Sequence, residues 1–228
     1  MQATQTRLLI SSVIDYTLLG TDATENDVMG LCDAARHYGF AAVCVNPWYV
    51  RMAAERLAGS QVRVATVVGF PLGATTELVK AVEAAQAVAV GAQELDMVIN
   101  VGALRSGHDR LVAQEIEAVV RAAGKALVKV ILETSLLTEE EKVQGCRLAS
   151  EAGAHFVKTS TGFGPGGATI GDVRLLRETV GTKMGVKAAG GIRDLATAKA
   201  MIDAGANRIG SSSGPAIAEE ELAEMAGR

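Results

Sequence analysis

Three of the eight lysines lie inside short apolar runs, where a charged side chain is unusual. Lys129 lies in Val-Lys-Val, Lys158 in Phe-Val-Lys-Thr and Lys187 in Gly-Val-Lys-Ala. A single lysine in such a run often extends its amine to water between helices. Two lysines near the carboxyl ends of adjacent strands would face each other instead. Burial and a like charge then lower the pKa of one amine from its usual value of about 10.4.

Such a pair predicts covalent chemistry at a carbonyl carbon. A neutral lysine attacks that carbon and forms a Schiff base, while a neighbouring ammonium group transfers protons. The spacing alone leaves open which lysine is the nucleophile. The other lysines fall on predicted helices, in loops or just before a strand, and we expect them to be solvated. These are Lys80, Lys125, Lys142, Lys183 and Lys199.

Carboxylates occur in the same kind of segment. Asp96 lies within Glu-Leu-Asp-Met-Val, on the same face as Glu94 because side chains alternate along a strand. It is either an acid/base partner of the lysines or a member of a structural ion pair. Asp15 and Glu133, at the ends of predicted strands, are further candidates. Lys129 and Glu133 would share a face, and we expect them to form a structural ion pair.

Glycines and hydroxyl residues gather after the last three predicted strands. Glycine lets backbone N–H groups approach an anion closely, and the amino end of a following helix attracts negative charge. This grouping therefore predicts a phosphate site close to the lysines. Its members are Thr161, Gly162, Gly190, Gly191, Gly210, Ser211 and Ser212.

Eight apolar runs recur along the chain with helical segments between them, at about 28 residues per unit, which is typical of a βα repeat. A capping box at Thr138 opens a helix that closes at Gly153, and Asp194 caps a helix over 195–204. The pattern predicts an α/β protein with one (β/α)₈ TIM barrel over residues 1–228. An open doubly wound sheet usually has fewer strands and a glycine-rich first turn. The predicted strands are Ser12–Asp15, Ala41–Val45, Val62–Val68, Glu94–Ile99, Leu127–Leu132, His155–Lys158, Gly185–Ala189 and Arg208–Gly210.

Composition narrows the class of protein. The 228 residues are 49% hydrophobic and 21% charged with a net charge of −4, and basic residues do not cluster. These features argue against binding to nucleic acid or to anionic membranes, and no apolar run is long enough to span a bilayer. The cysteines, Cys32, Cys44 and Cys146, fit neither a disulfide framework nor a zinc site. We expect a soluble cytoplasmic protein.

Six segments resemble the deoxyribose-phosphate aldolase family, and in order they span nearly the whole chain. The combination is specific, whereas one segment alone would be only suggestive. The segments are Ile-Asp-Tyr-Thr-Leu-Leu, Val-Cys-Val-Asn-Pro, Val-Gly-Phe-Pro-Leu-Gly, Glu-Leu-Asp-Met-Val-Ile-Asn-Val-Gly, Phe-Val-Lys-Thr-Ser-Thr-Gly-Phe and Val-Lys-Ala-Ala-Gly-Gly-Ile-Arg. The first departs from the family pattern, which has histidine where this chain has Tyr16.

The resemblance implies a class I aldolase without cofactor or metal that cleaves 2-deoxy-D-ribose 5-phosphate to acetaldehyde and D-glyceraldehyde 3-phosphate. By the family's motifs, Lys158 is the Schiff-base lysine, Lys187 its proton-handling partner and Asp96 a member of the same relay. Asp15 and Cys44 are expected beside the substrate. The only partners expected are small molecules and further copies of the chain, as a dimer or tetramer.

Two alternatives remain. The same fold and lysine chemistry could serve another substrate, as in a transaldolase-like or ketose-bisphosphate aldolase. The barrel could also bind a sugar phosphate without turnover. The presence of both lysines and Asp96 argues against this second alternative, because binding alone requires no lysine of lowered pKa.

Overall fold

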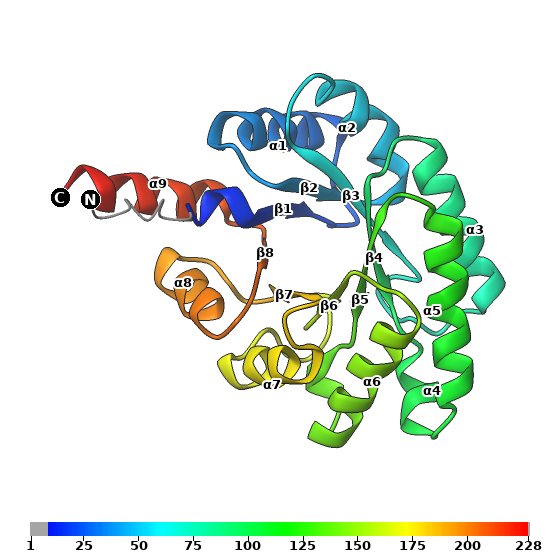
Figure 1. Ribbon diagram of the computed structural model, residues 1–228. Coiled ribbons are helices and arrows are strands. Elements are labelled where there is room, and N and C mark those ends of the chain that lie inside the picture. Colours follow the sequence, from blue (N-terminus) through cyan, green and yellow to red (C-terminus); the bar gives the residue numbers. More distant parts are fainter. Residues whose placement is uncertain (1–8, 228) are drawn as a thin grey trace, which may run out of the picture.

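Eight parallel strands close into a barrel in the computed structural model, which describes residues 9–227 (Figure 1). Each strand pairs with its neighbours in sequence, and β8 returns to β1, which confirms the predicted (β/α)₈ fold. The predicted β1 is displaced, because residues 11–13 form a 3₁₀ turn and the strand begins only at Ile14. The strands are β1 Ile14–Leu18, β2 Ala42–Val45, β3 Arg63–Val68, β4 Glu94–Val98, β5 Leu127–Ile131, β6 Phe156–Lys158, β7 Gly185–Ala189 and β8 Arg208–Ser211.

Helices surround the barrel and pack on the outer faces of the strands (Figure 1). Both predicted caps are confirmed: Thr138 and Glu141 make reciprocal capping bonds, and Asp194 accepts from the Thr197 N–H at 2.7 Å. The helices are α1 Glu25–Tyr38, α2 Val50–Arg56, α3 Glu77–Ala89, α4 Val101–Arg105, α5 Asp109–Ala123, α6 Glu139–Glu151, α7 Ile170–Val180, α8 Leu195–Asp203 and α9 Gly214–Ala226. The 3₁₀ turns are η1 Ser11–Val13, η2 Pro47–Tyr49 and η3 Thr134–Leu136.

The apolar residues divide into two cores. The large core lies between the strands and the helices, where outward-facing side chains such as Leu95 and Val157 are fully buried. A small core lies inside the barrel on one side, formed by Leu19, Ala42, Cys44, Ala65 and Val67. The inward faces of the other strands carry charged side chains, so half of the barrel interior is polar. This division determines where chemistry can occur.

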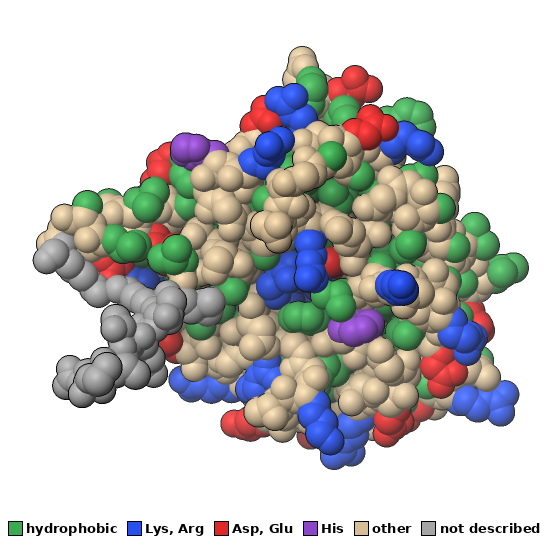
Figure 2. All heavy atoms as spheres, turned by 45° about the horizontal axis from the view of Figure 1, so that its top comes forward, with side chains coloured by type: hydrophobic (Ala, Val, Ile, Leu, Met, Phe, Trp, Pro, Cys, Tyr) green, Lys and Arg blue, Asp and Glu red, His purple; other side chains and the backbone are tan. Residues whose placement is uncertain are grey.

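The surface carries charges of both signs. On the face that Figure 2 presents, acidic and basic side chains are interspersed and hydrophobic side chains are scattered between them. Within residues 9–227, no helix is both long and apolar enough to cross a membrane.

Lys80 is fully buried, so the prediction that it is solvated is wrong. It lies on the face of α3 that packs on α5, and its Nζ donates to Glu115 Oε2 at 2.7 Å and to the Val98 carbonyl at 2.8 Å. The other oxygen of Glu115 accepts from the Asn100 N–H at 2.6 Å. Burial lowers the pKa of Lys80 and raises that of Glu115, against their mutual attraction. This pair holds the carboxyl end of β4.

The same prediction is wrong for Lys142. Its side chain is only 14% exposed, and its Nζ contacts Asp172 Oδ1 at 2.6 Å. In both cases the partner lies on another helix, so the helical pattern around the lysine could not reveal it. Lys125 and Lys183 are exposed, as predicted.

Replacing Lys80 by methionine should destabilise the fold by about 3–5 kcal/mol, because Glu115 becomes an unpaired buried charge. Adding Glu115→Gln should recover much of this loss, since the amide is neutral and its oxygen still accepts from Asn100. Urea unfolding of the single and double variants measures both effects. A single variant that loses less than about 1 kcal/mol would show that the pair does not support β4.

Candidate active site

Lys158 and Lys187 lie side by side inside the barrel, as the sequence predicts. Lys158 is the last residue of β6, and it is paired in register with Lys187 of β7. Both amines donate to the same oxygen of Asp96, Oδ2, at 2.7 Å. Lys187 also contacts Asp15 Oδ2 at 2.5 Å. The lysines are 2% and 0% exposed, so their charges are set by each other and by these carboxylates.

Lys129 belongs to the same network, at a lower level of the barrel. Its Nζ lies 2.7 Å from Asp96 Oδ1, 2.7 Å from Glu94 Oε2 and 3.4 Å from Asp15 Oδ2. Arg208 of β8 completes this level by contacting both Asp15 and Glu94.

The expected ion pair between Lys129 and Glu133 is therefore wrong. Strand β5 ends at Ile131, and Glu133 adopts a left-handed conformation with φ of 56°. The alternation of side chains on which the prediction relied stops at the end of the strand. Lys129 points into the barrel, whereas the Glu133 carboxyl contacts Thr161 in the loop after β6.

The charges of this buried network balance only when one lysine is neutral. The paired groups are the carboxylates Asp15, Glu94 and Asp96 and the cations Lys129, Lys187 and Arg208. Three negative and three positive charges cancel, so a proton on Lys158 would add an uncompensated charge in a dry interior. Arg63 also approaches Glu94, at 3.2 Å, but its side chain is half exposed and water screens its charge.

The pKa directions agree with this balance. Burial lowers the pKa of Lys158, aided by Lys187, and Asp96 only partly opposes it. Burial also acts to lower the pKa of Lys187, but Asp15 and Asp96 together raise it above its usual value. The Asp96 carboxyl resists the effect of burial because three lysines surround it, and its pKa lies well below the usual range. The site therefore places the Lys158 amine, whose pKa is lowered, beside the Lys187 ammonium group and the Asp96 carboxylate.

A cavity of about 310 Å³ opens above Lys158 at the carboxyl ends of the strands. Backbone geometry shapes its rim: Gly190 has φ of 94°, and a Cβ on Gly167 would lie 2.4 Å from the Gly190 carbonyl oxygen. Only glycine permits this close approach. All of the predicted phosphate residues line this cavity: Thr161, Gly162, Gly190, Gly191, Gly210, Ser211 and Ser212.

The sequence analysis missed several residues of the same wall. Arg193 and Phe163 line the cavity, together with Thr17 and Leu19 from the β1 end of the barrel. Arg193 could have been found, because it is the only cationic residue in the loop 190–194 that follows β7.

Two predicted substrate contacts do not line the cavity. Asp15 is fully buried beneath Lys187, near the beginning of β1 rather than at its end. Cys44 lies in the small inner core, and burial raises the pKa of its thiol.

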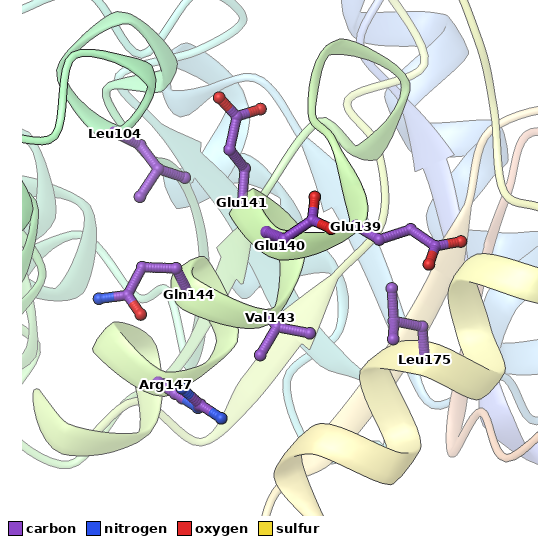
Figure 3. A pocket seen from close by; sticks show the side chains of 8 residues that line it. All are labelled: Leu104, Glu139, Glu140, Glu141, Val143, Gln144, Arg147 and Leu175. Atoms are coloured by element: carbon purple, nitrogen blue, oxygen red, sulfur yellow. The ribbon is translucent and has the colours of Figure 1, made fainter.

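A larger cavity, of about 590 Å³, lies elsewhere, between α4, α6 and α7 (Figure 3). The carboxylates of Glu139 and Glu141 point in different directions there and converge on no common point. No predicted site residue lines it. The smaller cavity above Lys158 is therefore the candidate active site.

Comparisons with known proteins identify relatives that match nearly the whole chain. The model of the DeoC/LacD family of aldolases matches residues 11–220. A deoxyribose-phosphate aldolase from Geobacillus sp. (strain WCH70) is 60% identical over 94% of this chain and 96% of its own length. The solved structure of QR15, an aldolase, has a TM-score of 0.91 at 43% identity, covering 95% of this chain and 97% of that one. A deoxyribose phosphate aldolase from Aeropyrum pernix, described as a unique tetrameric structure, has a TM-score of 0.88 at 36% identity, covering 94% and 92%.

The lowered pKa of Lys158 should appear in its reactivity. A lowered pKa makes the amine neutral at lower pH, so its acetylation rate should rise with pH and level off below the value of about 10.4 typical of a free lysine. Peptide mass spectrometry after brief treatment with acetic anhydride measures this rate. The side-chain amine of free Nα-acetyl-lysine is the reference. A Lys158 profile that follows the reference up to pH 10 would contradict the charge balance.

Proposed function

This chain belongs to the DeoC/LacD family of aldolases, and we propose that it is a class I deoxyribose-phosphate aldolase in which Lys158 forms the Schiff base. The reaction is the reversible cleavage of 2-deoxy-D-ribose 5-phosphate to acetaldehyde and D-glyceraldehyde 3-phosphate. The observation that supports this assignment is the network beneath Lys158, in which a proton on its amine would be an uncompensated charge, and the residue lines the cavity.

The first half of the reaction forms the Schiff base. The neutral Lys158 amine attacks C1 of the open-chain sugar and gives a neutral carbinolamine. Lys187 then donates a proton to the departing hydroxyl group, water leaves, and Lys158 becomes a protonated imine. One positive charge has moved from Lys187 to Lys158, and Asp96 contacts both nitrogens at 2.7 Å. The network therefore keeps its net charge.

The second half cleaves the carbon chain. The imine withdraws electrons as the C2–C3 bond breaks, and the C3 hydroxyl proton returns to neutral Lys187, through Asp96 or a water molecule. This step releases D-glyceraldehyde 3-phosphate and leaves a neutral enamine on Lys158. Lys187 next protonates the enamine at C2. Water then attacks the imine, its proton goes back to Lys187, and acetaldehyde leaves with both lysines restored.

The 5-phosphate binds at the glycine-rich end of the cavity. Gly190, Gly191 and Ser212 line this end, and Arg193 supplies the positive charge that a phosphate dianion needs. This role for Arg193 provides a local positive charge in a chain whose net charge is −4.

Trapping with acetaldehyde tests the assignment directly. Borohydride reduces an imine to a stable amine, so the chain should gain one ethyl group, located on Lys158 by peptide mass spectrometry. Lys158→Ala should lose both the adduct and all measurable cleavage, whereas Lys183→Ala, at an exposed lysine, should retain both. Cleavage that survives in Lys158→Ala would refute the nucleophile, and a trapped lysine elsewhere would reassign it. The absence of any adduct on the unaltered chain would favour a barrel that only binds sugar phosphate.

We also propose that the chain acts as one barrel domain over residues 1–228 and forms a dimer or tetramer in the cytoplasm. The tetrameric relative from Aeropyrum pernix supports the assembly, as do the exposed apolar side chains Leu78 and Val82 on α3. The free, buried thiols of Cys32, Cys44 and Cys146 are typical of reducing compartments.

Light scattering of the purified chain should therefore give a multiple of its 23.6 kDa mass, because a second copy would cover apolar side chains on α3 that now face water. A mass of one chain at micromolar concentration would contradict the proposed assembly.

A further inference from the structure

Glu133 is the one non-glycine residue with positive φ among residues 9–227, and the proposed reaction does not use it. It follows β5 directly, its φ is 56°, and it is only 4% exposed. A charged residue rarely adopts this conformation and is rarely buried. A position that combines both features is held by its surroundings.

The backbone on either side of Glu133 is fixed to the strand that carries Lys158. The Leu132 N–H donates to the Lys158 carbonyl at 3.0 Å, and the Thr134 N–H donates to the Thr159 carbonyl at 2.9 Å. Glu133 lies between these two bonds, so its left-handed turn directs the side chain onto the loop that follows β6. These backbone bonds do not involve the carboxyl group.

The Glu133 carboxyl organises that loop through a chain of hydrogen bonds. Its Oε2 accepts from the Thr161 N–H at 3.2 Å and from the Thr161 hydroxyl at 2.5 Å. The same hydroxyl oxygen accepts from the Phe163 N–H at 3.0 Å. Gly164 packs against the carboxyl so closely that a Cβ there would lie 2.7 Å from the Glu133 carboxyl carbon. One side chain thus fixes the turn 161–164.

The buried carboxyl and the left-handed backbone of Glu133 both lower the stability of the fold. The second oxygen, Oε1, is buried and has no hydrogen-bond partner within the described part of the chain. A buried polar atom without a partner is destabilising, and native structures contain few of them. The left-handed backbone adds strain. We therefore expect the contribution of Glu133 to be the turn 161–164 that its carboxyl holds in place.

We infer that Glu133 is a positioning residue for the phosphate end of the substrate. It holds Thr161, Gly162 and Phe163 in the lining of the cavity, which they share with Gly190 and Ser211. The inference rests on the proposed function. It assigns to Glu133 no contact with the substrate and no part in proton transfer at Lys158.

A positioning role and a merely structural role predict different kinetics. The loop 161–164 contributes to the phosphate end of the cavity, whereas Lys158 is fixed by backbone bonds that survive loss of the carboxyl. Loss of Glu133 should therefore weaken the binding of 2-deoxy-D-ribose 5-phosphate and leave the slow cleavage of unphosphorylated 2-deoxy-D-ribose nearly unchanged. A structural defect would reduce the cleavage of both sugars alike.

The test compares Glu133→Gly with Glu133→Gln on the two sugars. Glycine accepts positive φ without strain, so Glu133→Gly removes the carboxyl while favouring the same backbone. For the phosphorylated sugar, we expect the KM of Glu133→Gly to rise at least about tenfold while kcat changes little. For the unphosphorylated sugar, its kcat/KM should stay within about twofold of the unaltered chain, because only phosphate binding is lost. The amide oxygen of Glu133→Gln can still accept from Thr161, so this variant should resemble the unaltered chain on both sugars.

Thr161→Val provides a second variant if Glu133→Gly fails to fold, as judged by circular dichroism. It keeps the shape of Thr161 and removes the hydroxyl that links Glu133 to Phe163, so it should shift KM in the same direction. Equal losses on both sugars, or no loss on the phosphorylated one, would overturn the inference. Acetaldehyde trapping on the unaltered chain is measured first, because its failure would refute the proposed function and not the role of Glu133.

Discussion

A barrel interior that excludes water must keep its charges in balance, and this constraint determines the chemistry of the site. Three buried carboxylates pair with three cations, of which Lys129 and Lys187 are fully buried, so a proton on Lys158 would be an uncompensated charge. Burial of an isolated lysine would also lower its pKa, but the neutral amine would then have no ammonium group beside it. Here Lys187 remains charged because Asp15 and Asp96 stabilise it. In the proposed reaction, the same network thus provides a nucleophile and an acid of the same residue type.

The division of the barrel interior makes this network local. On the side of β2 and β3, the inward positions are small or aliphatic, and Cys44 lies among them as a packing residue. On the opposite side, inward positions of β4 to β8 carry the charged groups, and β1 adds Asp15. The apolar half keeps water away from one flank of the lysines, which preserves the strength of the electrostatic interactions between them. Packing and catalysis therefore depend on the same alternation of side chains along each strand.

Much of this arrangement follows from local sequence, and the rest depends on contacts that local sequence does not show. The period of two along Glu94–Val98 places Glu94 and Asp96 on one face, and the position of Lys158 in a short apolar run predicts its location. The pattern could not show that Lys80 is buried, since Glu115 lies 35 residues away on another helix. It also could not show that the left-handed residue after β5 would be Glu133, because glycine is the usual residue there. Both errors concern charged groups whose partners are distant in sequence.

The short strand β6 connects the lysines of the site to the glycine-rich end of the cavity. The strand has only three residues and ends at Lys158, and the next residues, Thr159 to Gly162, pass directly into the wall of the cavity. Thr159 fixes the start of this segment, because its hydroxyl donates to the Ala189 carbonyl at 3.0 Å and accepts from the Ala189 N–H at 3.1 Å. Glu133 fixes its far end through Thr161. A segment held at both ends fixes the distance between the Lys158 amine and the glycine-rich end of the cavity. In the proposed reaction, binding of the phosphate at that end would therefore place C1, four carbons away, within reach of Lys158.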